Sequence, residues 1–218
     1  MSRIISVITG DIVGSSDAPQ GALERTMQLL SRAAGELTYW SLPPARFTRF
    51  RGDGWQVLVN APELAPRAAL FLTARLRADP EAMASRMSIG TGPFASLGGA
   101  DLSDARGAAF ELSGRGLDAM SRLRLLSVEG EGLTALHPVV LDLLEQHCRK
   151  WTRDQAAAAA LALHPGNPTL QDMASVLGIS PQAVNYRLSG GAVQAIRRAL
   201  TGWEEAFLAH AETGSWTR

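Results

Sequence analysis

The order of strand-like and helix-like segments constrains the fold of this chain most strongly. Short apolar runs rich in β-branched residues lie at 4–9 and 85–92, and a stretch at 45–62 has two such runs separated by Gly52-Asp53-Gly54. Glycine and aspartate suit the tight turn of a hairpin. Between these strand-like segments, residues 21–40 and 63–77 carry apolar side chains at helical spacing. The first half of the chain therefore alternates strands and helices.

This order, strand-helix-strand-strand-helix-strand, predicts an α+β fold with a ferredoxin-like βαββαβ sheet and helices on one of its faces. After a glycine-rich segment at 93–104, which we expect to be a loop, residues 107–122 favour a further helix and residues 123–128 a last strand.

The composition changes after Gly132, where strand-like runs end and alanine-rich helical segments begin. We predict two domains, a ferredoxin-like domain over 1–130 and an all-α domain over 131–218. A content of 46% hydrophobic and 19% charged residues is that of an ordinary globular protein.

The segment 169–188, TLQDMASVLGISPQAVNYRL, has the pattern of a helix-turn-helix. Thr169 and Ser180 suit helix N-caps, Pro181 suits a first helical position, and Gly178 suits the turn. In such motifs the second helix enters the major groove. The residues that we expect to contact DNA are Ser180, Gln182, Asn185, Tyr186 and Arg187. The alternative is a helical hairpin that only packs or dimerises, which the balanced charge of this half favours.

Two aspartates form the second candidate site. Asp11 ends the first strand, and Asp53 lies in the hairpin turn. In a ferredoxin-like sheet the strands beside these residues are central neighbours, so both carboxylates reach one edge. Paired carboxylates with phosphate oxygens suit Mg²⁺. The segment 14–16, Gly-Ser-Ser, would offer backbone N–H groups to phosphate at a helix start. The alternative is that each aspartate only stabilises its own loop.

Charge and motifs exclude several function classes. The formal net charge is +0, so no global field draws the chain to nucleic acid or to a membrane surface. A P-loop motif and a nucleophile-elbow motif are both missing from the sequence, and its four histidines lack the spacing of zinc ligands. One cysteine rules out an internal disulfide, and no run suits a signal peptide or a membrane span, so we expect a cytoplasmic protein.

The segments DIVGSS, RFRGDGWQV, SRMSIGTGPFASLGG and DARGAAFELSGRGLD resemble, in this order, conserved segments of the class III nucleotidyl cyclases and, more distantly, of the diguanylate cyclases. The likeness spans about residues 4–122. It implies a nucleotide bound with Mg²⁺ on Asp11 and Asp53. Nucleotide contacts would come from Ile12, Gly14, Ser15 and Ser16, with Arg49 and Asp104 at the positions that read the base. Arg115 would match the arginine that stabilises the transition state.

Two positions depart from the cyclase pattern. Glu111 stands where the resemblance calls for an asparagine that orients the ribose. A carboxylate repels phosphate and cannot donate a hydrogen bond as an amide does. Arg49 in place of lysine is not conservative either. The resemblance therefore implies binding without turnover.

The whole layout, an N-terminal ITGDIVGS, an RGD hairpin, an IGxG strand, a GxAFxxS helix and a C-terminal helix-turn-helix, resembles the SatD family of bacterial proteins. It implies the same architecture over nearly the full chain. Our hypothesis is a homodimeric transcription regulator that binds DNA and a nucleotide. The alternatives are an active nucleotidyl cyclase or nucleotidyltransferase with a regulatory helical tail, and a non-catalytic dimerisation scaffold.

Overall fold

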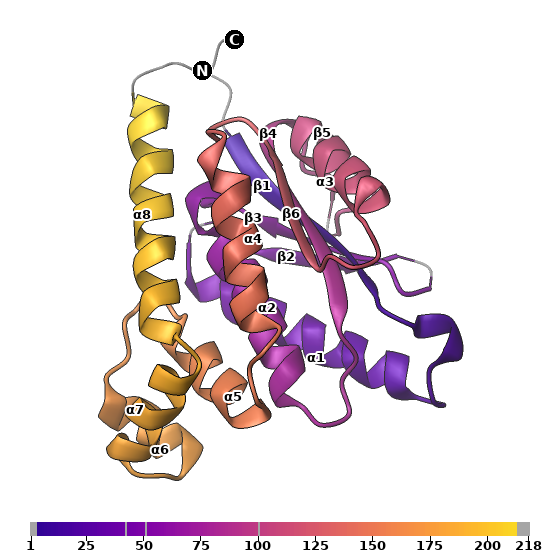
Figure 1. Cartoon of the computed structure of the whole chain (residues 1–218). Helices are drawn as coiled ribbons and strands as arrows, with labels where there is room; N and C mark the ends of the chain where they lie inside the picture. Colours follow the sequence, from indigo (N-terminus) through magenta and orange to yellow (C-terminus); the bar gives the residue numbers. More distant parts are fainter. Residues whose placement is uncertain (1–3, 42, 51, 100, 213–218) are drawn as a thin grey trace.

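The computed structural model describes residues 4–41, 43–50, 52–99 and 101–212. Within these ranges the chain forms an α+β structure with one six-stranded sheet and eight α-helices (Figure 1). No helix in the described ranges is long and apolar enough to cross a membrane.

The strands of the sheet are mostly antiparallel. They are β1 (Ile4–Ile12), β2 (Arg46–Arg49), β3 (Trp55–Val59), β4 (Ser85–Ser96), β5 (Arg106–Gly107) and β6 (Leu126–Gly130). Their order is β2-β3-β1-β4-β5, and β6 runs parallel to β4. Strand β1 therefore lies between β3 and β4. The pairing of β1 with β3 agrees with the neighbour relation predicted from the sequence. The segment predicted as a loop at 93–104 is strand in its first four residues, which prolong β4.

The helices fall into two groups along the chain. Those between the strands are α1 (Ala22–Glu36), α2 (Ala65–Ala78) and α3 (Ala108–Ala119). Those after the last strand are α4 (Leu136–Cys148), α5 (Arg153–Ala162), α6 (Leu170–Leu177), α7 (Pro181–Gly190) and α8 (Val193–Glu212). The predicted change from a mixed to an all-helical half is confirmed.

Helices cover both faces of the sheet. Alternate residues of β1 point to opposite faces: Ile8 and Ile12 belong to the core beneath α1 and α2, whereas Ile5 and Val7 belong to a smaller core beneath α3. Our expectation of helices on one face holds for α1 and α2 only. Helix α3 takes the other face because β1 and β3 carry apolar side chains there as well.

Glycines of β4 and α3 let this helix approach the sheet closely. A Cβ atom on Gly90 would lie 2.2 Å from the carbonyl oxygen of Ala109, and one on Gly116 would lie 2.3 Å from Ser88 Oγ. The IGxG segment of β4 therefore forms a surface without side chains at Gly90, against which α3 packs closely.

The helical half packs against α2. Ten of the 14 residues of α2 are buried, because the sheet lies on one side of the helix and α4 and α5 on the other. The main hydrophobic core runs from β1 through α2 to Phe207 of α8 without interruption. The division at 130/131 thus marks a change of composition, and one core spans it.

Candidate functional site

The two predicted aspartates lie at one edge of the sheet. Asp11 is the second-to-last residue of β1. Thr9, two residues earlier, contacts Ser113 of α3 (Oγ1–Oγ 2.7 Å), so the Asp11 side chain also faces the α3 side. Gly10 pairs with Trp55 across the β1–β3 ladder, which places Asp53 beside the end of β1. The charges of both aspartates act on the Arg86 guanidinium of β4.

Gly10, the residue before Asp11, has a separate role. A Cβ atom there would lie 2.4 Å from the ring of Trp55 and 2.7 Å from the carbonyl oxygen of Arg86. The Trp55 indole is fully buried and donates a hydrogen bond from Nε1 to Ser85 Oγ (3.0 Å). Ser85 Oγ in turn donates to the backbone oxygen of Asp11 (2.6 Å). Gly10 thus leaves room for the Trp55 indole on one face of the sheet, and Asp11 carries its carboxylate on the other face.

Arg86 holds the Asp11 carboxylate. Its Nε donates to Oδ1 (2.9 Å) and its Nη2 donates to Oδ2, in a two-bond pairing between adjacent strands. This hydrogen bond raises the pKa of Arg86, and the charges of Asp11, Asp53 and Asp118 raise it further. Both side chains are about three-quarters buried, at 23% and 25% exposure. The negative charge of Asp11 is therefore balanced by a cation of the chain itself.

The segment 14–16 after β1, which we expected to begin a helix, does not begin α1. Ser15–Asp17 is a single 3-10 turn, and α1 begins only at Ala22. Gly14 precedes the turn in the left-handed conformation, with φ 72°. Ser15 Oγ donates to Asp53 Oδ2, while Ser16 is exposed. Because α1 starts six residues after Ser16, its N-terminal N–H groups do not belong to the Gly14–Ser16 segment.

The Asp11 and Asp53 carboxylates are of the type that binds Mg²⁺, but they are not arranged as a Mg²⁺ site. Mg²⁺ takes carboxylate oxygens and is commonly held by one or two of them together with phosphate. Among the described residues, however, no three acidic, histidine or cysteine side chains form a group that could hold a metal ion. Arg86 also occupies both oxygens of Asp11. The residues as arranged do not fit a Mg²⁺ ion on Asp11 unless Arg86 leaves it.

The other positions implied by the cyclase resemblance lie on several elements. Arg49, at the end of β2, forms an ion pair with Glu24 of α1 (2.6 Å). Asp104 is exposed in the loop before β5, and Glu111 and Arg115 are exposed on α3. Ile12 is 3% exposed, so its side chain belongs to the core rather than to a ligand site.

The sequence analysis missed two residues of this edge, Arg86 and Asp118. Asp118 lies near the end of α3, and its charge acts on Arg86. An arginine at the second position of an otherwise uncharged strand was the available signal for Arg86, because a buried charge needs a partner. The identity of that partner depends on which residue lies opposite in the ladder.

The segment predicted as a helix-turn-helix forms α6 and α7. Thr169 and Asp172 make a capping box, in which Thr169 Oγ1 accepts from the Asp172 N–H (3.2 Å) and Asp172 Oδ2 accepts from the Thr169 N–H (2.9 Å). The Thr169 hydroxyl also donates to Asp172 Oδ2 (2.7 Å), and this bond, followed by the one from the Thr169 N–H, lowers the pKa of Asp172. Gly178 ends α6 in the left-handed conformation, with φ 66°, and Ser180 Oγ accepts from the Ala183 N–H (3.1 Å). The predicted caps are confirmed.

The exposed face of α7 carries three of the predicted DNA contacts. Gln182 and Asn185 are exposed, and Tyr186 is 81% exposed. Arg187 differs from our expectation of an outward side chain. Its Nη2 pairs with Asp154 Oδ2 of α5 (2.9 Å), and the side chain is only 23% exposed. The reason is helical spacing: Arg187 is three residues after Val184 and next to Leu188, which both face the core.

Comparisons with protein-family models and with curated proteins found no match to this chain.

Proposed function

We propose that the protein is a DNA-binding regulator that uses α6 and α7 as a helix-turn-helix. The observation that carries this proposal is the geometry of the two helices: α6 is capped at both ends, a left-handed glycine makes the turn, and α7 exposes three polar side chains. Figure 1 shows α6 and α7 at one end of the molecule, away from the sheet. Nothing in the described part of the chain covers the exposed face of α7.

Base contacts, rather than charge, would carry recognition. Segment 169–190 contains one arginine and one aspartate, and that arginine is paired with Asp154. Gln182 and Asn185 have the amide groups that suit adenine edges in the major groove. The proposal therefore includes sequence-selective binding with a shallow dependence on salt.

The proposal also includes a homodimer, since two-fold operators match dimeric helix-turn-helix proteins. The outer face of α4 supports it. Leu136, Val139 and Leu143 lie on this face at helical spacing and are 71%, 53% and 62% exposed. The dimer would be tested by sedimentation of the wild-type chain and of Leu143→Glu.

DNA binding is tested by fluorescence anisotropy on DNA from upstream of the gene. We expect Asn185→Ala and Tyr186→Ala each to weaken specific binding by about 1–3 kcal/mol if the side chain contacts a base edge. Gln28→Ala, an exposed polar position on α1 and outside both α7 and the outer face of α4, is the matched control and should leave binding unchanged. Equal affinity of all variants for specific and unrelated DNA would contradict the proposal.

For the N-terminal half we propose a ferredoxin-like, cyclase-like domain that binds a nucleotide with Mg²⁺ at the Asp11–Asp53 edge, without turnover. The strand order β2-β3-β1-β4 is that of a ferredoxin-like sheet and supports this part. Arg86 would leave Asp11 when the metal-nucleotide complex binds. Glu111, exposed on α3, is the residue that argues against catalysis. The SatD resemblance and a cytoplasmic location remain predictions.

A thermal-shift panel tests the nucleotide site. Ligands that bind the native state raise the unfolding midpoint. We expect ATP or GTP with Mg²⁺ to raise it in the wild type and not in Asp53→Asn. Arg86→Gln should bind Mg²⁺ more tightly than the wild type, because Asp11 is then free of its internal cation. Release of pyrophosphate with Mn²⁺ would favour the active cyclase, and no shift with any nucleotide would favour the dimerisation scaffold.

A further inference from the structure

A pocket of about 430 Å³ lies where the sheet half meets the helical half. It is formed by the end of α2, the 79–84 segment, the start of β4, the end of α4 and the start of α5. The pocket shares no residue with the Asp11–Asp53 edge, and Ser85 separates the two: its hydroxyl lines the pocket and bonds the backbone of Asp11. Its volume is within the range of small-molecule sites.

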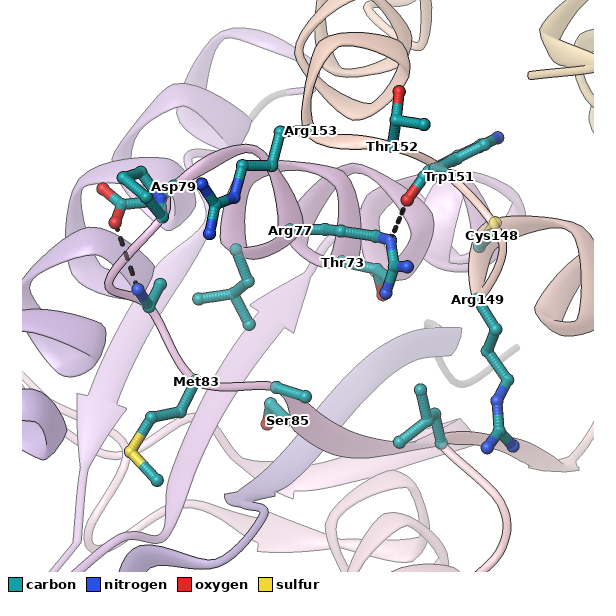
Figure 2. Close-up of a pocket in the computed structure, with 15 residues that line it drawn as sticks. Thr73, Arg77, Asp79, Met83, Ser85, Cys148, Arg149, Trp151, Thr152 and Arg153 are labelled. Atoms are coloured by element: carbon teal, nitrogen blue, oxygen red, sulfur yellow. Dashed lines mark hydrogen bonds between the residues drawn. The ribbon is translucent and has the colours of Figure 1, made fainter. Parts of the chain in front are cut away.

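Arginines from three segments surround this pocket. Figure 2 shows Arg77 of α2 and Arg153 of α5 at its upper wall, and Arg149, directly after α4, on its right side. Asp79 is the one acidic residue among the lining side chains of the described chain. Its Oδ1 already accepts hydrogen bonds from the N–H groups of Glu81 (2.8 Å) and Ala82 (3.1 Å). The lining is therefore positively charged.

The three guanidinium groups are engaged to different degrees. Arg149 Nη1 donates to the Leu123 carbonyl and to Glu145 (3.2 Å). Arg77 donates from Nε to the Trp151 carbonyl, which leaves its two terminal nitrogens. Arg153 has no ion pair or side-chain hydrogen bond with another described residue. Arg77 and Arg153 therefore keep donors for a ligand, in the forked geometry that suits carboxylate and phosphate.

The remaining wall is apolar. Leu76, Met83 and Leu125 line it, together with Cys148. Burial raises the pKa of Cys148, so this thiol stays neutral and does not compete as an anion. An inorganic ion would leave these apolar groups without a partner, whereas an organic ligand would cover them.

We propose that this pocket binds a small organic anion, a carboxylate or a phosphate monoester with an apolar body. The anionic group lies between Arg77 and Arg153, and the body lies against Leu76 and Leu125. The ligand would touch both halves of the chain. Arg153 is followed by Asp154, the partner of Arg187 in α7, so the pocket adjoins the base of the proposed DNA-binding element. An effect on DNA binding rests on the proposed function, but ligand binding itself does not.

The test uses phenyl phosphate and benzoate as probes and phenol as their neutral counterpart, in calorimetric titrations of the full chain without DNA. We expect both anions to bind, phenol to bind at least about tenfold more weakly, and added salt to weaken the anions. If only one of the two anions binds, that result identifies the anionic group. Arg153→Gln should lose at least about tenfold in affinity, while Arg153→Lys should keep part of it.

Arg32→Gln is the matched control, because Arg32 is an exposed arginine on α1, outside the pocket. It should bind the anions as the wild type does. Circular dichroism checks that each variant folds, and Arg77→Gln replaces Arg153→Gln if that variant does not. The proposal would be overturned if neither phenyl phosphate nor benzoate bound below about 10 mM. Unchanged affinity in the glutamine variant would overturn it too, and neither outcome depends on DNA binding.

Discussion

A buried ion pair between α2 and α8 makes a strong prediction about how the two halves are held together. Arg67 is 5% exposed, and its Nε and Nη2 donate to Glu204 Oε1 (2.6 Å) and Oε2 (3.0 Å). Truncation in Glu204→Ala would leave the guanidinium buried without its counter-charge. The Glu204 side chain is itself 17% exposed, so water would reach part of the space it leaves.

The magnitude follows from this geometry. Removing one partner of a buried pair costs about 3–5 kcal/mol, and the partial access of water places Glu204→Ala near the lower end, at about 3 kcal/mol. For a chain of this length each kcal/mol lowers the midpoint by about 2–4 °C, so the expected fall is about 6–12 °C. Glu204→Gln keeps an acceptor oxygen and should lose less.

Thermal and urea unfolding followed by circular dichroism would measure the loss. The matched control is Glu81→Ala, which removes an exposed pair with Arg25 (3.1 Å) and should cost less than about 1 kcal/mol. The double variant Arg67→Met/Glu204→Leu should be more stable than Glu204→Ala, because it leaves no buried charge. A loss in Glu204→Ala no larger than in Glu81→Ala would refute the reasoning.

Three further predictions concern single positions. Gly10→Ala places a methyl group 2.4 Å from the Trp55 ring, so we expect a loss of about 1–3 kcal/mol in urea unfolding, and an unchanged midpoint would contradict the packing. In Gly178→Ala the new methyl group meets no atom within 4 Å, but the residue must adopt φ 66°, so we expect a loss of stability of about 1–2 kcal/mol in thermal unfolding. Gly178→Asn should lose less, and equal losses in the two variants would argue against a backbone cause. Burial lowers the pKa of His137, which is 4% exposed and accepts the Thr134 N–H at Nδ1 (2.8 Å). The unfolded state therefore binds this proton first, and stability should fall as pH decreases below about 6.5. In His137→Phe this part of the pH dependence should disappear, and an identical pH profile would exclude His137 as its cause.

The sequence was most informative where the interactions are local. The caps of α6 and α7 join residues three positions apart, such as Thr169 with Asp172 and Ser180 with Ala183. Such bonds form whenever the helix forms, so the residue types alone predict them. The strands and helices of the first half follow from hydrophobic periodicity in the same way. The neighbour relation of β1 and β3, which brings Asp11 and Asp53 together, was instead predicted from the order of these elements, because that order is typical of a ferredoxin-like sheet.

Only the tertiary structure decided what those side chains contact. Asp11 and Arg86 are 75 residues apart and meet because of the β1–β4 register, which depends on the packing of both strands. Arg187 turns to Asp154 because α5 packs beside α7. Helix α3 takes the second face of the sheet because Gly90 and Gly116 permit its approach. Local preference therefore determined which elements form, and long-range packing determined which charges they pair, since the partner of a buried charge is set by three-dimensional proximity.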